Sequence, residues 1–196
     1  MRSRRQAITI SETDSSCLPE YARIPIAFEV TEIFEPATLM PGVDITGSTA
    51  RPTASPYTKN YDAYASSGPL HWASSFDVTR WRFLMAYVGK DVAGGAVVVA
   101  QQDSIAMLEA RCDLAVLWDL RVVPEFRRSG VGTALLSGVE RVARMDGAAE
   151  LKVETQNINV AACRFYSRHG LTLRKVSPEA YPGLPGEARL LWYKAL

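Results

Sequence analysis

The stretch from Trp118 to Thr133, WDLRVVPEFRRSGVGT, combines residue types that could hold an anion. Its first half is apolar and β-branched, which favours a strand that ends at Pro124, because proline cannot donate to a sheet ladder. Arg127, Arg128 and a glycine-bearing turn then lead into a helical pattern. Unpaired main-chain N–H groups at a helix start and the helix dipole both attract negative charge. We therefore expect a phosphate-bearing ligand here.

Spacing excludes two familiar nucleotide-binding motifs in this stretch. The pattern GxxxxGK[ST] of the P-loop is absent, and so is the dinucleotide pattern GxGxxG. Gly130 allows a tight turn, and Gly132 allows close approach of a ligand. Taken alone, the same residues are equally compatible with an ordinary strand-to-helix turn.

Hydrophobic periodicity predicts the elements that would position this stretch. Two apolar runs around Gly89-Lys90-Asp91 predict a hairpin, and a third antiparallel strand follows. Gly94 and Gly95 inside the hairpin indicate a bulge or a close approach of main chain. The whole pattern predicts one mixed α/β domain over residues 25–196. Expected strands cover residues 26–34, 81–88, 92–101, 115–123, 150–155, 171–176 and 188–193, and expected helices cover 131–145 and 157–169.

Two regions lack a clear period. Residues 1–24 are polar, and we interpret them as an N-terminal tail with little fixed structure. Residues 36–56 are rich in proline and glycine, which predicts a loop. Tyr57, Tyr61 and Tyr64 then recur at helical spacing, either as an aromatic stripe that packs on the core or as one wall of a substrate pocket.

A second motif lies beyond the next expected strand. The pattern Asn159-x-x-Ala162-x-x-Phe165-Tyr166 falls in the second expected helix. Together with LRVVP and RRSGVG, it resembles the GNAT N-acetyltransferase family over residues 81–196. The resemblance implies an α/β (α+β) GNAT fold, in which a mostly antiparallel sheet of about seven strands splays between the family's fourth and fifth strands and is flanked by helices.

Within the family, the C-terminal half is most similar to streptothricin acetyltransferases. The run ETQNINVAACRFYSRHG carries this likeness, with shorter matches at FEV and LLWY. It implies a small cationic amine as acceptor and a role in antibiotic resistance. Two alternatives stay open: a protein N-terminal or lysine acetyltransferase, and a non-catalytic acyl-CoA-binding module.

The resemblance also implies that acetyl-CoA is the cosubstrate, and the residues suit its chemistry. The turn and the helix start can chelate the pyrophosphate through main-chain N–H groups. The amide-rich pantetheine arm can pair with the strand edge between Leu120 and Val122. Ser129 stands where the family often has glycine. The expected cofactor-binding residues are Leu120, Val122, Arg127, Arg128, Ser129, Gly130, Val131, Gly132, Thr133 and Asn159.

Two proton transfers require side chains. The departing thiolate needs an acid, and Tyr166 occupies the position that serves this role in the family. The attacking ammonium must lose a proton, for which Asp119 and Glu154 on the two central strands are the alternatives. Trp118 and Asp119 are expected to point to opposite faces of their strand, so only one of them would face the pocket.

Composition sets the remaining expectations. A net charge of +1 over 196 residues, without a basic stripe, argues against a nucleic-acid partner. No apolar run is long enough to span a membrane. The three widely spaced cysteines form no metal-ligand spacing, so we expect no metal. We expect a cytoplasmic protein that acts on a small-molecule amine, and a homodimer is compatible with the sequence.

Overall fold

A computed structural model describes residues 7–64 and 67–196, which divide into two compact units. The first unit takes the described residues up to Ile26, those from 61 to 149, and Leu196. The second unit takes residues 27–60 and 150–195. The expectation of a single domain from residue 25 onward stays a prediction.

The first unit is built on four antiparallel strands in the order β1-β4-β5-β6. The predicted hairpin and third strand are confirmed as β4 (Arg82–Val88), β5 (Asp91–Ala100) and β6 (Leu114–Val122). The interpretation of residues 1–24 as an unstructured tail is wrong for the described part, because Ile8–Thr13 form β1 and pair along β4. This short strand alternates apolar residues only at Ile8 and Ile10, too briefly for the pattern to reveal it. Residues 1–6 lie outside the described residues.

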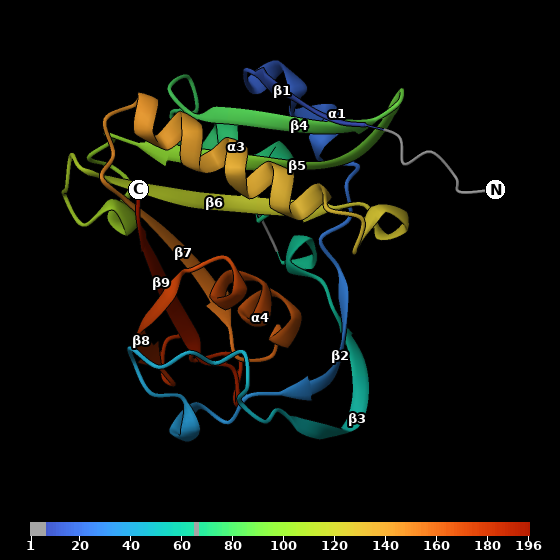
Figure 1. Cartoon of the computed structure of the whole chain (residues 1–196), viewed down its shortest axis with the longest axis vertical. Coiled ribbons are helices and arrows are strands. Elements are labelled where there is room, and N and C mark those ends of the chain that lie inside the picture. The colour runs from blue at the N-terminus through green and yellow to red at the C-terminus, as the bar shows by residue number, and fades with distance from the viewer. Residues whose placement is uncertain (1–6, 65–66) are drawn as a thin grey trace. The chain divides into compact units, whose positions relative to one another are not determined.

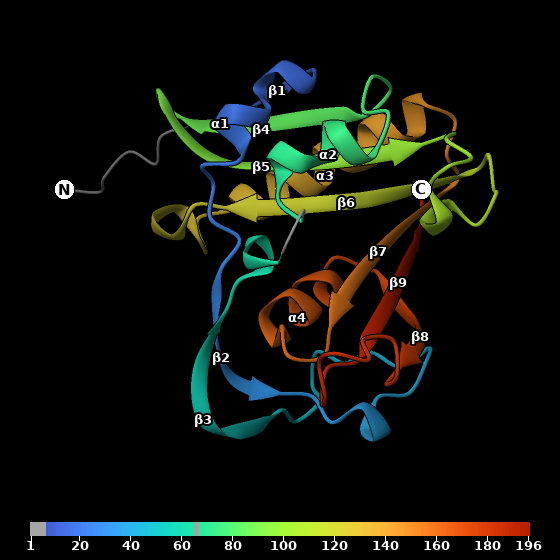
Figure 2. The ribbon, with the colours of Figure 1, turned by 180° about the vertical axis from the view of Figure 1, so that it is seen from behind.

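Helices cover both faces of these four strands. On one face α3 (Val131–Met145) lies across β4, β5 and β6 and buries Leu135, Val139 and Val142 (Figure 1), as its apolar stripe predicts. On the other face lie α1 (Leu18–Tyr21) and α2 (Pro69–Ser75), which the sequence did not predict (Figure 2). The first unit is therefore a three-layer arrangement, with the strands between helices.

The second unit contains three antiparallel strands and a separate hairpin. The strands β7 (Glu150–Gln156), β9 (Arg189–Ala195) and β8 (Thr172–Ser177) lie in that order, and α4 (Val160–Arg168) packs on β7. The hairpin pairs β2 (Phe28–Ile33) with β3 (Arg51–Lys59). At its end Lys59 forms a buried ion pair with Glu187 at 2.5 Å.

The described strands and helices confirm the expected fold class. Four strands of the first unit and three of the second supply the seven mostly antiparallel strands, with α1 to α4, that the family fold requires. The expected splay is a relation between β6 and β7, which belong to different units, and it stays a prediction.

The region from 36 to 64 differs from its expectation. Residues 51–56 belong to β3 rather than to a loop, because among the described residues β3 is paired only with β2 and can direct Pro52 and Pro56 to its open edge. Tyr57 lies in β3 and Tyr61 in a 3-10 turn, so the three tyrosines do not form a helix. Their spacing resembled a helical stripe by coincidence.

Candidate active site

The stretch between β6 and α3 has the geometry of an anion-binding turn. After a 3-10 turn at Pro124–Phe126, the chain passes through left-handed conformations at Arg128 (φ 64°) and Gly130 (φ 101°). Helix α3 begins at Val131, and Gly130 stands at its N-cap without any side-chain cap. The N–H groups of the first helical turn are consequently not capped by a side chain from that position, which suits a bound phosphate.

Two side-chain bonds fix the shape of this turn. The Nε of Arg127 donates to the carbonyl of Val122 at 3.1 Å. The hydroxyl of Ser129 donates to the carbonyl of Phe126 at 2.6 Å, a bond that glycine at this position could not make. Arg127, Arg128 and Ser129 are all exposed, so the turn presents its charge to solvent.

The main chain of β6 is directed as the cofactor hypothesis requires. Val123 N–H donates to the carbonyl of Ala93 at 3.0 Å, and the register places Arg121 opposite Gly95. In an antiparallel ladder, alternate residues bond to the same neighbour. The N–H and C=O groups of Leu120 and Val122 therefore point away from β5, toward the edge that would pair with a pantetheine arm.

Gly94 and Gly95 allow close packing on opposite faces of the sheet. A Cβ on Gly94 would lie 2.5 Å from the carbonyl oxygen of Arg121 and 3.2 Å from the side chain of Val131, on the α3 side. A Cβ on Gly95 would lie 2.5 Å from the ring of Tyr21, on the α1 side. The close approach and the bulge predicted at these glycines are both present. The bulge is a one-residue shift in the β4–β5 register just before Gly94.

Strand β6 contains an extra residue at Trp118. Asp119 pairs with Val97, whereas Leu117 pairs with Val98, so Trp118 has no partner of its own in the β5–β6 ladder. Such a bulge breaks the alternation of side chains. The expectation that Trp118 and Asp119 point to opposite faces is wrong for this reason.

Both side chains instead reach one group of aromatic rings. The indole of Trp118 lies 4.9 Å from that of Trp81, which lies 6.0 Å from Trp72. Trp72 in turn lies 5.8 Å from the ring of Tyr21, whose hydroxyl donates to Asp119 at 2.7 Å. A continuous aromatic wall therefore runs from α1 through α2 to the bulge.

Asp119 is part of a buried charge network. Its carboxylate accepts from Tyr21 at 2.7 Å and from Arg121 at 2.9 and 3.0 Å, and its side chain is 7% exposed. Arg121 also forms a paired bond to the carboxylate of Asp62, at 2.6 and 2.9 Å. Burial raises the pKa of Asp119, which the bonds from Arg121 and Tyr21 oppose. Sequence reasoning missed the roles of Tyr21 and Arg121, because no periodic pattern connects them to Asp119.

Glu154 has a network of its own in the second unit. The hydroxyl of Tyr181 donates to Glu154 Oε1 at 2.7 Å and accepts from the side-chain amide of Gln156 at 2.8 Å. Burial, followed by the nearby Glu154 carboxylate, raises the pKa of Tyr181 and keeps it a neutral donor. Tyr181 lies in the Pro/Gly-rich stretch before β9, where the sequence indicated only a loop.

The remaining predicted residues lie on α4, also in the second unit. Tyr166 is buried, and its ring lies 5.3 Å from that of Phe165. Asn159 is the N-cap of α4, where its side-chain oxygen accepts from Ala162 N–H at 3.1 Å. The first unit thus gathers the turn, β6 and Asp119, while the second gathers Tyr166, Glu154 and Asn159. The roles assigned to them stay predictions.

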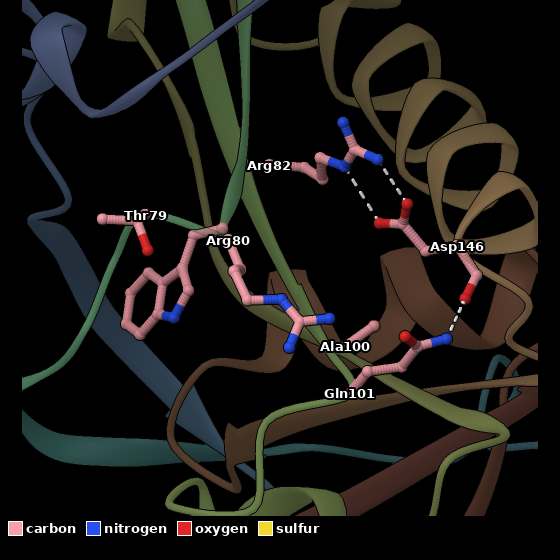
Figure 3. Close-up of a pocket in the computed structure, with 7 residues that line it drawn as sticks. Thr79, Arg80, Arg82, Ala100, Gln101 and Asp146 are labelled. Carbon is pink, nitrogen blue, oxygen red and sulfur yellow. Dashed lines mark hydrogen bonds and ion pairs between the residues drawn. The ribbon is translucent and has the colours of Figure 1, made fainter.

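A cavity of about 290 Å³ opens elsewhere in the first unit, at the C-terminal end of α3 (Figure 3). Its wall includes Arg82, which holds Asp146 through a paired bond at 3.0 and 2.5 Å. The predicted site residues do not line it. Within residues 7–64 and 67–196, no group of His, Cys, Asp and Glu side chains is arranged for a metal ion. None of the helices in that part of the chain is long and apolar enough to cross a membrane.

Comparison with known proteins decides the family. The model of the acetyltransferase (GNAT) family matches residues 51–171, more than half of the chain. The chain belongs to the GNAT family. As a GNAT protein it is an acetyl-CoA-dependent N-acetyltransferase, and acetyl-CoA is its cosubstrate.

Two relatives of this GNAT protein are both named as streptothricin acetyltransferases. Streptothricin acetyltransferase A of Bacillus subtilis (strain 168) is 29% identical over 56% of this chain and 66% of its own length, so the match spans slightly less than two thirds of that relative. Streptothricin acetyltransferase of Streptomyces lavendulae is 25% identical over 87% of this chain and 84% of its own length.

Two solved structures are similar over nearly the whole GNAT chain. A nourseothricin acetyltransferase is 25% identical with a TM-score of 0.69, covering 96% of this chain and 98% of its own. A protein from Bacillus anthracis str. Ames, provisionally named a streptothricin acetyltransferase and bound to acetyl coenzyme A, has a TM-score of 0.72 over 97% and 99% of the two chains. At 22% identity, the latter shows the fold alone.

Proposed function

We propose that this GNAT protein transfers acetyl from acetyl-CoA to a primary amine of a small cationic substrate of the streptothricin type. The observation that carries the proposal is the likeness, over nearly the full chain, to nourseothricin and streptothricin acetyltransferases. The shorter match to the Bacillus subtilis enzyme supports the same acceptor class. In a cell, such a reaction would confer resistance to the antibiotic.

The proposed reaction is a direct attack in a ternary complex. The amine nitrogen forms a bond to the acetyl carbon, the thioester C–S bond breaks, and the coenzyme A thiolate leaves. The pyrophosphate is held at the turn before α3, through the N–H groups that follow Gly130. The pantetheine arm pairs with the edge of β6 at Leu120 and Val122. No covalent enzyme intermediate is required.

Two side chains are assigned to the proton transfers. Tyr166 donates a proton to the leaving thiolate. We assign the base to Glu154 rather than to Asp119, since both oxygens of Asp119 already accept bonds from Arg121 or Tyr21. Glu154 is half-buried, and Tyr181 orients it through one oxygen. The base takes the proton of the substrate ammonium, directly or through water.

A thiol-release assay with an amine panel tests the proposal. The panel holds a streptothricin mixture, simple diamines, and a peptide with a free N-terminus and a lysine, and mass spectrometry identifies each product. Rapid acetylation of the streptothricin, with little turnover of the peptide, is the expected result. Acetylation of the peptide alone would instead indicate a protein acetyltransferase. Binding of acetyl-CoA without turnover of any amine would indicate a non-catalytic acyl-CoA-binding module.

A further inference from the structure

Arg121 places all five of its N–H groups on partners within the first unit. Its Nε donates to Asp119 at 2.9 Å, and Nη1 donates to the carbonyl of Ile24 at 3.2 Å and to Asp62 at 2.6 Å. Its Nη2 donates to Asp62 at 2.9 Å and to Asp119 at 3.0 Å. The side chain is 1% exposed. A buried guanidinium with this many fixed bonds holds its partners in one geometry.

Apart from Asp119, which lies on β6 itself, the partners of Arg121 lie where the chain leaves the first unit and where it returns. Ile24 precedes the departure after Ile26 by two residues. Asp62 directly follows Tyr61, the residue at which the chain returns to the first unit. The intervening residues 27–60, which include β2 and β3, belong to the second unit. The Arg121 side chain on β6 therefore binds the chain both just before and just after residues 27–60.

We propose that Arg121 is a positioning residue for acetyl transfer, which fixes these two chain ends and thereby the segment 61–64 on the acceptor side. The inference rests on the proposed function for the nature of the acceptor. The segment carries Tyr61, which is half-buried, and Tyr64, which is 44% exposed. Rings held in this way can contact a small cationic substrate. Arg121 acts through Asp62 and touches no reacting atom.

The cofactor half of the site does not depend on the same bonds. The turn before α3 is held by Arg127 on Val122 and by Ser129 on Phe126. Helix α3 packs against the face of the sheet opposite to α1 and α2 (Figure 2). The Arg121 guanidinium lies on the α1 side, with its central carbon 5.5 Å from the centre of the Tyr21 ring. Loss of the Asp62 contact should therefore weaken use of the amine and leave acetyl-CoA binding intact.

The substitution Asp62→Asn is the sharpest test, because it leaves the pair between Arg121 and Asp119 in place. Asp146→Asn is its matched control. Asp146 also accepts a paired bond from a single arginine, Arg82, and its side chain is 19% exposed against 26% for Asp62. It lies in the same unit, next to the cavity described above. The two variants thus remove the same charge and the same kind of bond.

Kinetics and hydrogen exchange provide separate readouts. In Asp62→Asn the KM for the amine should rise by about 5- to 50-fold, as expected when a substrate-holding segment is displaced, while the KM for acetyl-CoA stays within about twofold. The amides of residues 61–64 should exchange faster than in the wild type. Asp146→Asn should leave all three quantities near wild type, and thermal unfolding verifies that both variants are folded.

Three results would overturn the inference. They are equal amine KM values in the two variants, a parallel rise in the KM for acetyl-CoA in Asp62→Asn, and unchanged exchange of residues 61–64 in Asp62→Asn. If the wild-type protein acetylated no amine, the proposed function would fail, and the exchange experiment would still decide whether Arg121 anchors this segment through Asp62.

Discussion

The carbonyl oxygen of Arg121 lies 2.5 Å from the position that a Cβ on Gly94 would occupy. Because Val131 and Leu135 of α3 crowd the same point, at 3.2 and 3.1 Å, the helix can approach the sheet this closely only above a glycine. Gly94→Ala should lower the free energy of unfolding by about 1–3 kcal/mol, the usual cost of overpacking. Urea unfolding followed by circular dichroism measures it.

Gly47→Ala is the control for this substitution. Its Cβ would have nothing within 4 Å, and Gly47 does not have a positive φ. The change should leave the unfolding free energy within about 0.5 kcal/mol of wild type. A Gly94→Ala protein as stable as Gly47→Ala would contradict the close packing of α3 on β5.

Gly130→Glu should abolish acetyl-CoA binding. Gly130 has φ 101°, which a residue with a Cβ rarely adopts, and a carboxylate there would repel the pyrophosphate. Calorimetric titration with acetyl-CoA should show a rise of at least about 100-fold in Kd, since a misplaced turn and a like charge act together. Ser129→Gly, one residue earlier, should bind within a fewfold of wild type, and comparable losses in both variants would contradict the special role of Gly130.

Tyr166→Phe separates catalysis from binding. Loss of a general acid should lower kcat by about 100- to 10,000-fold while the Kd for acetyl-CoA is unchanged. Single-turnover thiol release and calorimetry measure the two quantities. Tyr87→Phe, at a half-buried position in β4, should retain wild-type kcat. Full activity in Tyr166→Phe would exclude this tyrosine as the acid.

The assignment of the base is tested by the pH dependence of kcat/KM. A general base acts only in its unprotonated form, so kcat/KM should show a limb that rises with pH. Glu154→Gln should remove this limb together with most of the activity. Asp119→Asn should retain the limb even where activity falls, because both oxygens of Asp119 already accept bonds and the proton is assigned to Glu154. Loss of the limb in Asp119→Asn alone would reverse the assignment.

Cys163 should make stability decline at alkaline pH. Burial raises its pKa to about 12 in the folded chain, whereas a thiol in an unfolded chain has a pKa of about 8.5. Between these values the folded state keeps a proton that the unfolded state releases. The stability from this group is therefore complete below pH 8.5 and is lost as the pH rises, by roughly 1 kcal/mol per pH unit.

The variant Cys163→Ala isolates that contribution. Its stability difference from wild type, measured by urea unfolding in a series from neutral to alkaline pH, should shrink progressively above about pH 8.5. Cys112 is exposed, so the stability of the Cys112→Ala variant should change with pH in the same way as that of the wild type. A Cys163→Ala difference that stays constant with pH would show that the buried thiol does not keep its proton.

Elements with long, regular patterns were predictable from the sequence. Helix α3 has the bounds expected from its apolar stripe and the glycine that precedes it. The strands β4, β5 and β6 lie within one or two residues of their predicted positions, since each is an apolar run bounded by turn residues. The glycine-bearing turn was identified for the same reason, because its residue types act locally.

Features that depend on distant contacts were not predictable. Strand β1 forms because it pairs with β4, roughly seventy to eighty residues further along the chain. Asp119 is bonded to Tyr21 of α1 and to Arg121 of β6, and Arg121 is bonded in turn to Asp62, with no spacing in the sequence that connects these residues. The bulge at Trp118 is visible only in the pairing with β5.

The unpaired position of Trp118 makes β6 sensitive to length as well as to composition. Deletion of one residue between Leu117 and Asp119 would restore strict alternation, so that one half of the strand would present its side chains to the wrong layer. Replacement of the indole by another ring would leave the side chains of both halves of β6 on their present faces of the sheet. Among natural variants of this chain we therefore expect exchanges at position 118, and no single-residue insertion or deletion beside it.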